Sequence, residues 1–324
     1  MNHQQTVLVT GASGFIGREL VRQLSKKNVY VRATDIIEPK DEIFKLPNVA
    51  FVQADICEPN EVTRLFGGVD RVFHTAGVCN LTSPFEKLEP ININAVGLIS
   101  SIALQHSVSC FVHFSSTSIY GAYAGVPFNE QAPCLPKDNY GKSKLLGEEK
   151  IKSNMAKGLP AIILRPCTVY GPGCNDGAGK VFSRPGTIAG IPGNGKQKIA
   201  NIRVEDVAAS ALYLSEKQDA FGKIFNLADN SQPKLEDALA IAAKTFGSNF
   251  SRKHIPLFLM KVVALVEGAI AKRRHEIPDL EYEAIKYLYD DYIVDNTQLI
   301  NSGYQLIYPD FSESMKDLAT RINN

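Results

Sequence analysis

The sequence contains no tryptophan, and its six cysteines are scattered along the chain. No two of them form a CxxC pair, the spacing typical of zinc sites and redox dithiols. We therefore expect no metal site and no disulfide, but reduced thiols in a cytoplasmic protein.

An excess of charge of either sign is missing as well. The chain has 35 Lys and Arg residues against 34 Asp and Glu residues, and no long basic run. Proteins that bind nucleic acid usually concentrate positive charge, so this balance argues against a nucleic-acid partner. With 44% hydrophobic and 21% charged residues, the 324-residue chain has the composition of a soluble globular protein with one large core or two unequal lobes.

The sequence also lacks a clean hydrophobic run that could cross a membrane. Its N-terminus has no basic segment followed by an apolar one, so we expect no signal peptide. Residues 255–274 are very apolar, but Lys261 and Glu267 interrupt them, and the run falls short of the ~20 apolar residues of a spanning helix. Because this segment ends in a basic cluster, it predicts either a core helix of a substrate lobe, or a helix that contacts a membrane surface or lines an apolar pocket.

The first half of the chain alternates short β-branched runs with helical patterns. This alternation is typical of βαβ units and predicts an α/β fold with a Rossmann-type, doubly wound parallel sheet. We expect residues 1–170 to form an NAD-binding domain, to which residues 200–230 return. Residues 171–199 and 231–324 are expected to form a smaller, mainly helical lobe that binds the substrate.

A glycine triplet follows the first predicted strand and opens the first predicted helix. Gly11 allows a tight turn, Gly14 lets the backbone approach a pyrophosphate, and Gly17 lets the helix and strand pack closely. The helix N-terminus then faces the negative charge of a dinucleotide. The same turn supplies three further expected cofactor contacts, which are Ser13, Phe15 and Ile16.

Polar and small residues stand at the ends of the next predicted strands, where ligands bind in sheets of this kind. Asp35 ends the second strand, 18 residues after Gly17, and can accept hydrogen bonds from a ribose 2′-hydroxyl while repelling a 2′-phosphate. It therefore favours NAD over NADP. The third strand ends at Asp55 and Ile56, beside the expected adenine, and the fourth at Ala76 and Gly77, where a dinucleotide could cross.

Several stretches together resemble the extended short-chain dehydrogenase/reductase family, within the NAD-dependent epimerase/dehydratase superfamily. The matching stretches are TGASGFIG, ADI, HTAG, ININAVG, FSSTSIYG, YGKSK and LRPCTVYGPG, and they cover about the first 175 residues. Two more, NIRVEDVA and IFNLAD, extend the resemblance to about residue 230. The resemblance implies cofactor contacts at Asn94, Ser115, Tyr140, Lys144 and Pro166.

The resemblance also implies a catalytic set of Thr117, Tyr140 and Lys144. A phenol titrates near ~10, which is too high for efficient proton exchange at neutral pH. An ammonium one helical turn away stabilises the phenolate, so Lys144 is expected to activate Tyr140. Thr117 is expected to hold the substrate oxygen while Tyr140 transfers its proton.

Three departures from family patterns bear on the substrate. Ser118 and Ile119 stand where the 4,6-dehydratases carry an acidic pair, and Thr168 stands where many nucleotide-sugar epimerases carry an asparagine. Ile199, beside Lys198, stands where epimerases place a phosphate-binding arginine. By contrast, the stretches RPCTVYGPG and GNGKQKIANIRVEDVA, and the apolar helix with YDDYIVDNTQLINSGYQ, resemble the 3β-hydroxysteroid dehydrogenase and dihydroflavonol reductase-like branch.

The expected function is therefore the NAD-dependent interconversion of a secondary alcohol and a ketone on a lipophilic, steroid-like small molecule. The first alternative is a nucleotide-sugar 4-epimerase that retains its NAD. The second is a regulator that senses NAD(H) without turnover. Family members often pair through two long helices, here those that carry Asn94 and Tyr140, so we expect a homodimer.

Overall fold

A seven-stranded parallel sheet forms the centre of the protein in a computed structural model. The model describes residues 4–121, 127–174, 179–183, 186, 190–274, 278 and 280–323. The strands of the sheet are β1 (Thr6–Thr10), β2 (Tyr30–Asp35), β3 (Val49–Gln53), β4 (Arg71–His74), β5 (Cys110–Phe114), β6 (Ala161–Pro166) and β10 (Ile224–Leu227). Their order is β10-β6-β5-β4-β1-β2-β3, and each neighbouring pair is parallel. The predicted doubly wound, Rossmann-type sheet is confirmed.

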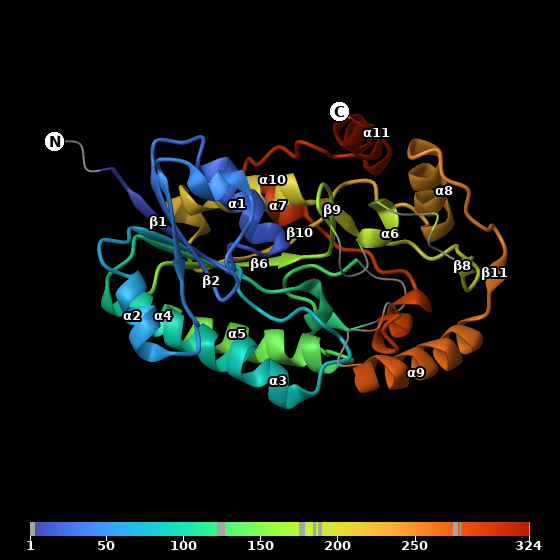
Figure 1. The fold of residues 1–324 in the computed structure, drawn as a ribbon, viewed down its shortest axis with the longest axis horizontal. Helices are drawn as coiled ribbons and strands as arrows, with labels where there is room; N and C mark the ends of the chain where they lie inside the picture. Colours follow the sequence, from blue (N-terminus) through green and yellow to red (C-terminus); the bar gives the residue numbers. More distant parts are fainter. Residues whose placement is uncertain are drawn as a thin grey trace.

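Helices cover both faces of this sheet (Figure 1). One face carries α1 (Phe15–Leu24) and α7 (Val204–Ser215), with α10 (Thr297–Asn301) beside them. The other face carries α2 (Pro59–Leu65), α3 (Phe85–Glu89), α4 (Val96–Gln105) and α5 (Asn139–Met155). A π-helical segment, Pro90–Ala95, joins α3 to α4.

The strands are apolar throughout because both of their faces are covered. In β1, Val7 and Val9 join the core cluster that contains α1 and α7, whereas Leu8 joins the cluster that contains α2, α4 and α5. The strand order reverses between β1 and β4, so the loops that leave these two strands diverge at their C-terminal ends. Ligands bind at such a switch point in sheets of this kind.

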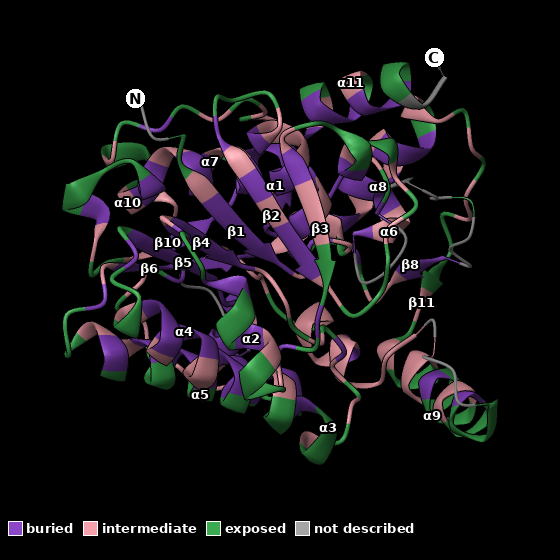
Figure 2. Cartoon of the chain, turned by 60° about the vertical axis from the view of Figure 1, so that its left-hand side comes forward, coloured by how far each residue is buried: buried purple, intermediate pink, exposed green. Residues whose placement is uncertain are grey.

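A second group of elements lies to one side of the sheet (Figures 1 and 2). Its helices are α6 (Lys180–Ser183), α8 (Leu235–Thr245), α9 (Leu257–Arg274) and α11 (Phe311–Asn323). Two short strand pairs belong to these connections: β7 (Thr168–Tyr170) with β9 (Asn201–Arg203), and β8 (Ile191–Pro192) with β11 (His254–Ile255). The remaining short helices are η1 (Glu42–Lys45), η3 (Thr117–Tyr120), η5 (Gln218–Ala220) and η6 (Glu283–Leu288).

The predicted lobe boundaries stay a prediction. Residues 175–178, 184, 185, 187–189, 275–277, 279 and 324 of the predicted substrate lobe lie outside the described residues. Three residues assigned to that lobe, Val294, Leu299 and Tyr304, belong to the core cluster under the sheet. The chain therefore returns to the sheet once more after α8 and α9.

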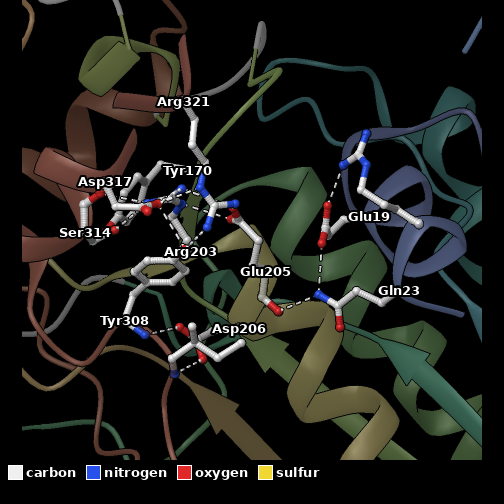
Figure 3. Close-up of polar contacts among 12 residues, drawn as sticks. Glu19, Gln23, Tyr170, Arg203, Glu205, Asp206, Tyr308, Ser314, Asp317 and Arg321 are labelled. Atoms are coloured by element: carbon white, nitrogen blue, oxygen red, sulfur yellow. Dashed lines mark hydrogen bonds and ion pairs between the residues drawn. The ribbon is translucent and has the colours of Figure 1, made fainter. Parts of the chain in front are cut away.

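Arg203, at the end of β9, holds the C-terminal segment against the start of α7 (Figure 3). Its guanidinium is fully buried, donates to both carboxylate oxygens of Glu205 at 2.9 and 3.0 Å, and reaches Asp317 at 2.9 Å. Asp206 accepts the backbone N–H groups of Ile307 and Tyr308 at 2.7 and 2.8 Å. A buried arginine needs such partners, because an unpaired charge in the interior is costly.

A second buried arginine fixes α5 to the sheet. Arg165, on β6, forms a two-pronged ion pair with Glu148 of α5, at 2.8 and 2.7 Å. Its remaining nitrogen donates to the Tyr120 hydroxyl at 2.8 Å, and that hydroxyl donates to Asn226 on β10 at 2.7 Å. The network sets the position of α5 relative to three neighbouring segments.

We expect Arg165→Met to lower the free energy of unfolding by about 3–5 kcal/mol, because it leaves the Glu148 carboxylate buried without its partner. The double variant Arg165→Met/Glu148→Leu should recover most of this loss. Denaturant unfolding measures both. As a control, Lys45→Met removes an exposed ion pair with Glu42 and should change stability by under about 1 kcal/mol. Equal losses in the single and double variants would contradict the role given to the pair.

Candidate active site

The glycine turn after β1 lies against the end of β4 with no space for side chains. Gly11 has φ +68°, and a Cβ there would come 2.6 Å from the Ala76 Cα. A Cβ at Gly17 would come 2.1 Å from the Gly11 carbonyl oxygen. Gly14 caps α1, whose first turn carries no acidic residue. The turn thus offers a helix N-terminus and bare backbone to an anionic ligand.

Asp35 is held beside this turn at the end of β2. Its carboxylate accepts the Ser13 N–H at 3.0 Å and the Ile37 N–H at 3.3 Å. Arg32, the cation nearby in the strand, donates instead to the Leu65 and Gly67 carbonyls at 2.6 and 2.8 Å. The geometry therefore presents a carboxylate, and no free arginine from this strand, to a ribose bound at the glycine turn.

The other predicted cofactor residues lie along the same edge of the sheet, with one exception. Phe15 and Ile16 are half-buried in the first turn of α1, Ile56 and Pro166 are buried, and Asp55 is exposed with Oδ1 accepting the Cys57 N–H. Ser115 is buried at the end of β5, and its Oγ has no partner. Asn94 is the exception, because its side chain is exposed on the π-helical segment.

Asn92, two residues before Asn94, is the asparagine of this segment that turns inward, and the cofactor contact of Asn94 stays a prediction. Asn92 is 1% exposed; its Oδ1 accepts the Val78 N–H at 2.9 Å, and its Nδ2 donates to the Ser143 hydroxyl at 2.9 Å. It therefore ties the loop after β4 to α5. The π-helical geometry of this segment decides which asparagine turns inward, and local pattern does not reveal it.

Tyr140 and Lys144 lie one turn apart on α5, both buried. Asp138 caps this helix by accepting the Gly141 N–H at 2.7 Å. Lys144 Nζ donates to the Phe114 carbonyl at 2.6 Å, and a Cβ on Gly77 would lie 3.6 Å from it. Burial lowers the pKa of Lys144 to about 8. The lysine thus carries its charge at neutral pH, at the point where β4 and β5 end.

The side chains of Ser116 and Cys79 lie near enough to the Tyr140 phenol to influence its pKa, which Cys79 raises and Ser116 lowers. Burial is the main reason why its pKa lies well above 10 before any ligand binds. The predicted hydroxyl, that of Thr117, turns away and donates to the Pro166 carbonyl at 3.4 Å. The Thr117 carbonyl accepts the Tyr292 hydroxyl at 2.6 Å.

Of the three hydroxyl residues at 115–117, the structure therefore brings Ser116 to the phenol. Ser116 caps the short helix η3, its Oγ accepting the Ser118 N–H at 3.1 Å. This turn interrupts the alternation of side chains along β5, so the sequence alone could not select one hydroxyl from the run.

Cys79 was also missed, because a cysteine in a loop carries no motif. The residue as a whole is exposed to solvent. Its thiol is nevertheless surrounded by protein, and this burial is the main cause that raises the pKa of the thiol. Its contact with Tyr140 places it at the reaction centre.

Residues after α9 complete the surroundings of the site. Glu281 accepts the Leu81 and Thr82 N–H groups at 2.5 and 3.1 Å, and the Tyr287 hydroxyl donates to Asp138 at 2.6 Å. These contacts join the loop after β4 and the start of α5 to a segment some 200 residues distant in sequence.

The arrangement fits a dinucleotide with a reactive end beside Tyr140. The glycine turn would hold the pyrophosphate, Asp35 the adenine-side ribose, and Lys144 the other ribose, while the unpartnered Ser115 hydroxyl faces the same edge. Two buried histidines beneath Lys144, His74 and His113, are kept neutral by burial, which lowers the pKa of His74 to about 3.

We expect Lys144→Met to stabilise the protein at pH 7 by about 1–2 kcal/mol. A Lys144 pKa near 8 in the folded protein, instead of 10.5, means that folding disfavours the charged lysine by about 3 kcal/mol. The variant also loses the hydrogen bond to the Phe114 carbonyl, which offsets about 1–2 kcal/mol of this gain. The unfolded lysine keeps its proton up to about pH 10.5, so the stability of the unaltered protein should rise from pH 8 to 10.5 and the difference should shrink. Denaturant unfolding at each pH measures this; Lys150→Met, at an exposed site, is the control. A destabilised variant at pH 7 would contradict it.

Known proteins share this fold and sequence pattern. The chain is 28% identical over 269 residues to the uncharacterized protein y4nG of Sinorhizobium fredii, a match that covers 82% of this chain and 67% of that protein. It is 32% identical over 182 residues to the uncharacterized UDP-glucose epimerase YtcB of Bacillus subtilis, covering 51% of this chain and only 57% of YtcB.

The fold is also that of a solved UDP-glucuronic acid 4-epimerase from Bacillus cereus, a complex with NAD. The TM-score is 0.77 at 20% identity, covering 99% of this chain and 100% of that one. Residues 7–228 match the sequence profile of a protein family, which is described as the NAD dependent epimerase/dehydratase family. Because this match covers more than half of the chain, the protein belongs to that family and is an NAD-dependent enzyme of the extended short-chain dehydrogenase/reductase type.

Proposed function

We propose that the enzyme is a nucleotide-sugar 4-epimerase that oxidises a secondary hydroxyl of the sugar and reduces the ketone from the opposite face. The observation that carries the proposal is the buried Tyr140 phenol, with the Ser116 hydroxyl beside it and the buried Lys144 ammonium one turn away on α5. The sugar substrate is supported by YtcB, whose name is that of a UDP-glucose epimerase.

The side chains divide the proton chemistry among them. NAD, when bound, supplies the hydride acceptor and donor. Tyr140 removes the proton of the substrate hydroxyl during oxidation and returns it to the carbonyl oxygen during reduction. Lys144 lowers the free energy of the phenolate, and Ser116 donates a hydrogen bond that orients the substrate oxygen. Because the two half-reactions cancel, an epimerase produces no net reduced cofactor.

Dehydration is not part of the proposal. The turn after β5 carries Ser118 and Ile119 where the resembling dehydratases have an acidic pair, and the Ser118 hydroxyl accepts a hydrogen bond from Ser116 at 3.1 Å. Asp138, an acidic side chain near Tyr140, is engaged in capping α5 and in binding Tyr287. We find no carboxylate on the described part of this turn that could act as the second acid or base.

A dehydrogenase of lipophilic alcohols is the second candidate. It is favoured by the weak grip on a diphosphate, because Arg203 is committed to its buried carboxylates and Ile199 packs in the cluster around α8. The apolar residues of α9 no longer support it as a pocket wall, because their large side chains face solvent. An NAD(H) sensor without turnover ranks third, since it would not need the Tyr140–Lys144 pair. The homodimer through α4 and α5 stays a prediction.

Assays with two substrate panels distinguish the candidates. We expect the purified enzyme to interconvert the 4-epimers of UDP-hexoses, detected by chromatography, without a net change in NADH absorbance. A panel of secondary alcohols, including steroids, with added NAD is the comparison. NADH formation from these alcohols, together with no change in any UDP-sugar, would contradict the epimerase and support the second candidate.

Substitution of the hydroxyl residues tests the assignment of Ser116. We expect Ser116→Ala to lower kcat by about 10²-fold, because it removes a hydrogen bond at the reacting oxygen. Thr117→Val should lower it by under about tenfold. Tyr140→Phe should abolish turnover while NAD still binds, which isothermal titration calorimetry reports. A larger loss from Thr117→Val than from Ser116→Ala would return the role to Thr117.

A further inference from the structure

The helix α9 is oriented in the opposite way to most surface helices. Two of its polar residues contact neighbouring segments: the Lys261 ammonium lies 4.8 Å from the centre of the Tyr289 ring, and Glu267 accepts the Leu280 N–H at 3.3 Å. Only Ala264 and Ala271 of this helix are buried. A surface helix normally turns its apolar stripe inward and its polar face to water.

The large apolar side chains of α9 face solvent instead. At least 45% of the surface of each of the following is exposed: Phe258, Leu259, Val262, Val263, Leu265, Val266 and Ile270. Figure 2 shows the helix at the edge of the molecule, away from the sheet. Soluble monomers rarely expose a continuous apolar patch of this extent, and such patches mark interaction surfaces.

Basic residues flank this apolar face at both ends. Arg252 and Lys253 precede the helix and are exposed, and the exposed residues Lys272, Arg273 and Arg274 end it. Glu267, the one acidic residue between positions 251 and 274, faces inward. An apolar face between two positive clusters is complementary to a surface that is anionic outside and apolar beneath.

This charge pattern also decides against a second copy of the chain as the occupant. If two α9 helices paired in parallel, each basic end would meet the same basic end of its partner. If they paired in antiparallel fashion, residues 252–253 would meet residues 272–274, which are also basic. Both arrangements place like charges together, which disfavours association.

The helix does not cross the bilayer. None of the helices that the structure describes is long and apolar enough to do so. The remaining way to bury the apolar face is for the helix to lie in the interfacial plane of one leaflet.

We propose that α9 docks the enzyme onto anionic membranes, with its apolar side chains inserted among the lipids and the basic ends at the phosphates. This proposal does not rest on the epimerase activity. It makes the enzyme a peripheral membrane protein whose residues 280–292, directly after the docking helix, contact the active site through Glu281, Tyr287 and Tyr292.

Vesicle co-sedimentation of the full chain tests the proposal. We expect binding to vesicles of phosphatidylcholine with about 30% phosphatidylglycerol, weak binding to phosphatidylcholine alone, and weakening of the former at about 0.5 M NaCl. Leu265→Ser/Ile270→Ser should lower partitioning about tenfold or more. Leu135→Ser/Ile307→Ser is the matched control, because it removes one leucine and one isoleucine of similar exposure elsewhere and should leave binding unchanged.

Two further measurements keep the outcome unambiguous. Thermal unfolding should show that both double variants are folded, and their turnover of a soluble substrate should equal that of the unaltered enzyme. Light scattering without lipid tests the second copy as occupant: self-association that Leu265→Ser/Ile270→Ser abolishes would overturn the proposal. Absence of binding to anionic vesicles, or equal binding by both double variants, would overturn it as well.

Discussion

The buried ion pair between Arg165 and Glu148 is the constraint on which the active site depends. It joins α5 to β6, and through Tyr120 and Asn226 it also reaches η3 and β10. The ion pair thereby fixes the position of α5, which carries the reacting Tyr140 phenol, relative to the carboxyl ends of the strands. A buried pair of this kind contributes more to geometric specificity than to net stability, because both charges must be desolvated.

The second constraint acts against stability. The Lys144 ammonium is enclosed at the end of β5, where it donates to the Phe114 backbone carbonyl, and the two histidines below it are neutral. Folding has to desolvate this charge, which is why its pKa falls toward 8. Such strain is common where a charge is needed for chemistry, and the ion pair one turn further along α5 holds the helix in place against it.

The proposed membrane surface and the active site meet in one stretch of chain. Residues 280–292 come after α9 in the chain and bind the loop after β4, the cap of α5 and the turn after β5 through side-chain hydrogen bonds. For residues 255–274 the sequence left a core helix, a membrane contact and a pocket wall open, and the structure directs their large apolar side chains to the outside of the molecule. The two charged residues that interrupt this segment, Lys261 and Glu267, contact Tyr289 and Leu280 of the same chain.

The sequence by itself determined the parallel sheet, the glycine turn and the position of Asp35, because each depends on a local pattern: strand periodicity, backbone freedom at glycine, or one residue at a strand end. Only the tertiary structure decided that Ser116 and not Thr117 meets the phenol, that Asn92 and not Asn94 turns inward, and that α9 shows its apolar face to solvent. These outcomes depend on an irregular turn, a π-helical segment and the docking of distant segments. No local pattern records them, because the partners that fix each side chain lie far away in the chain.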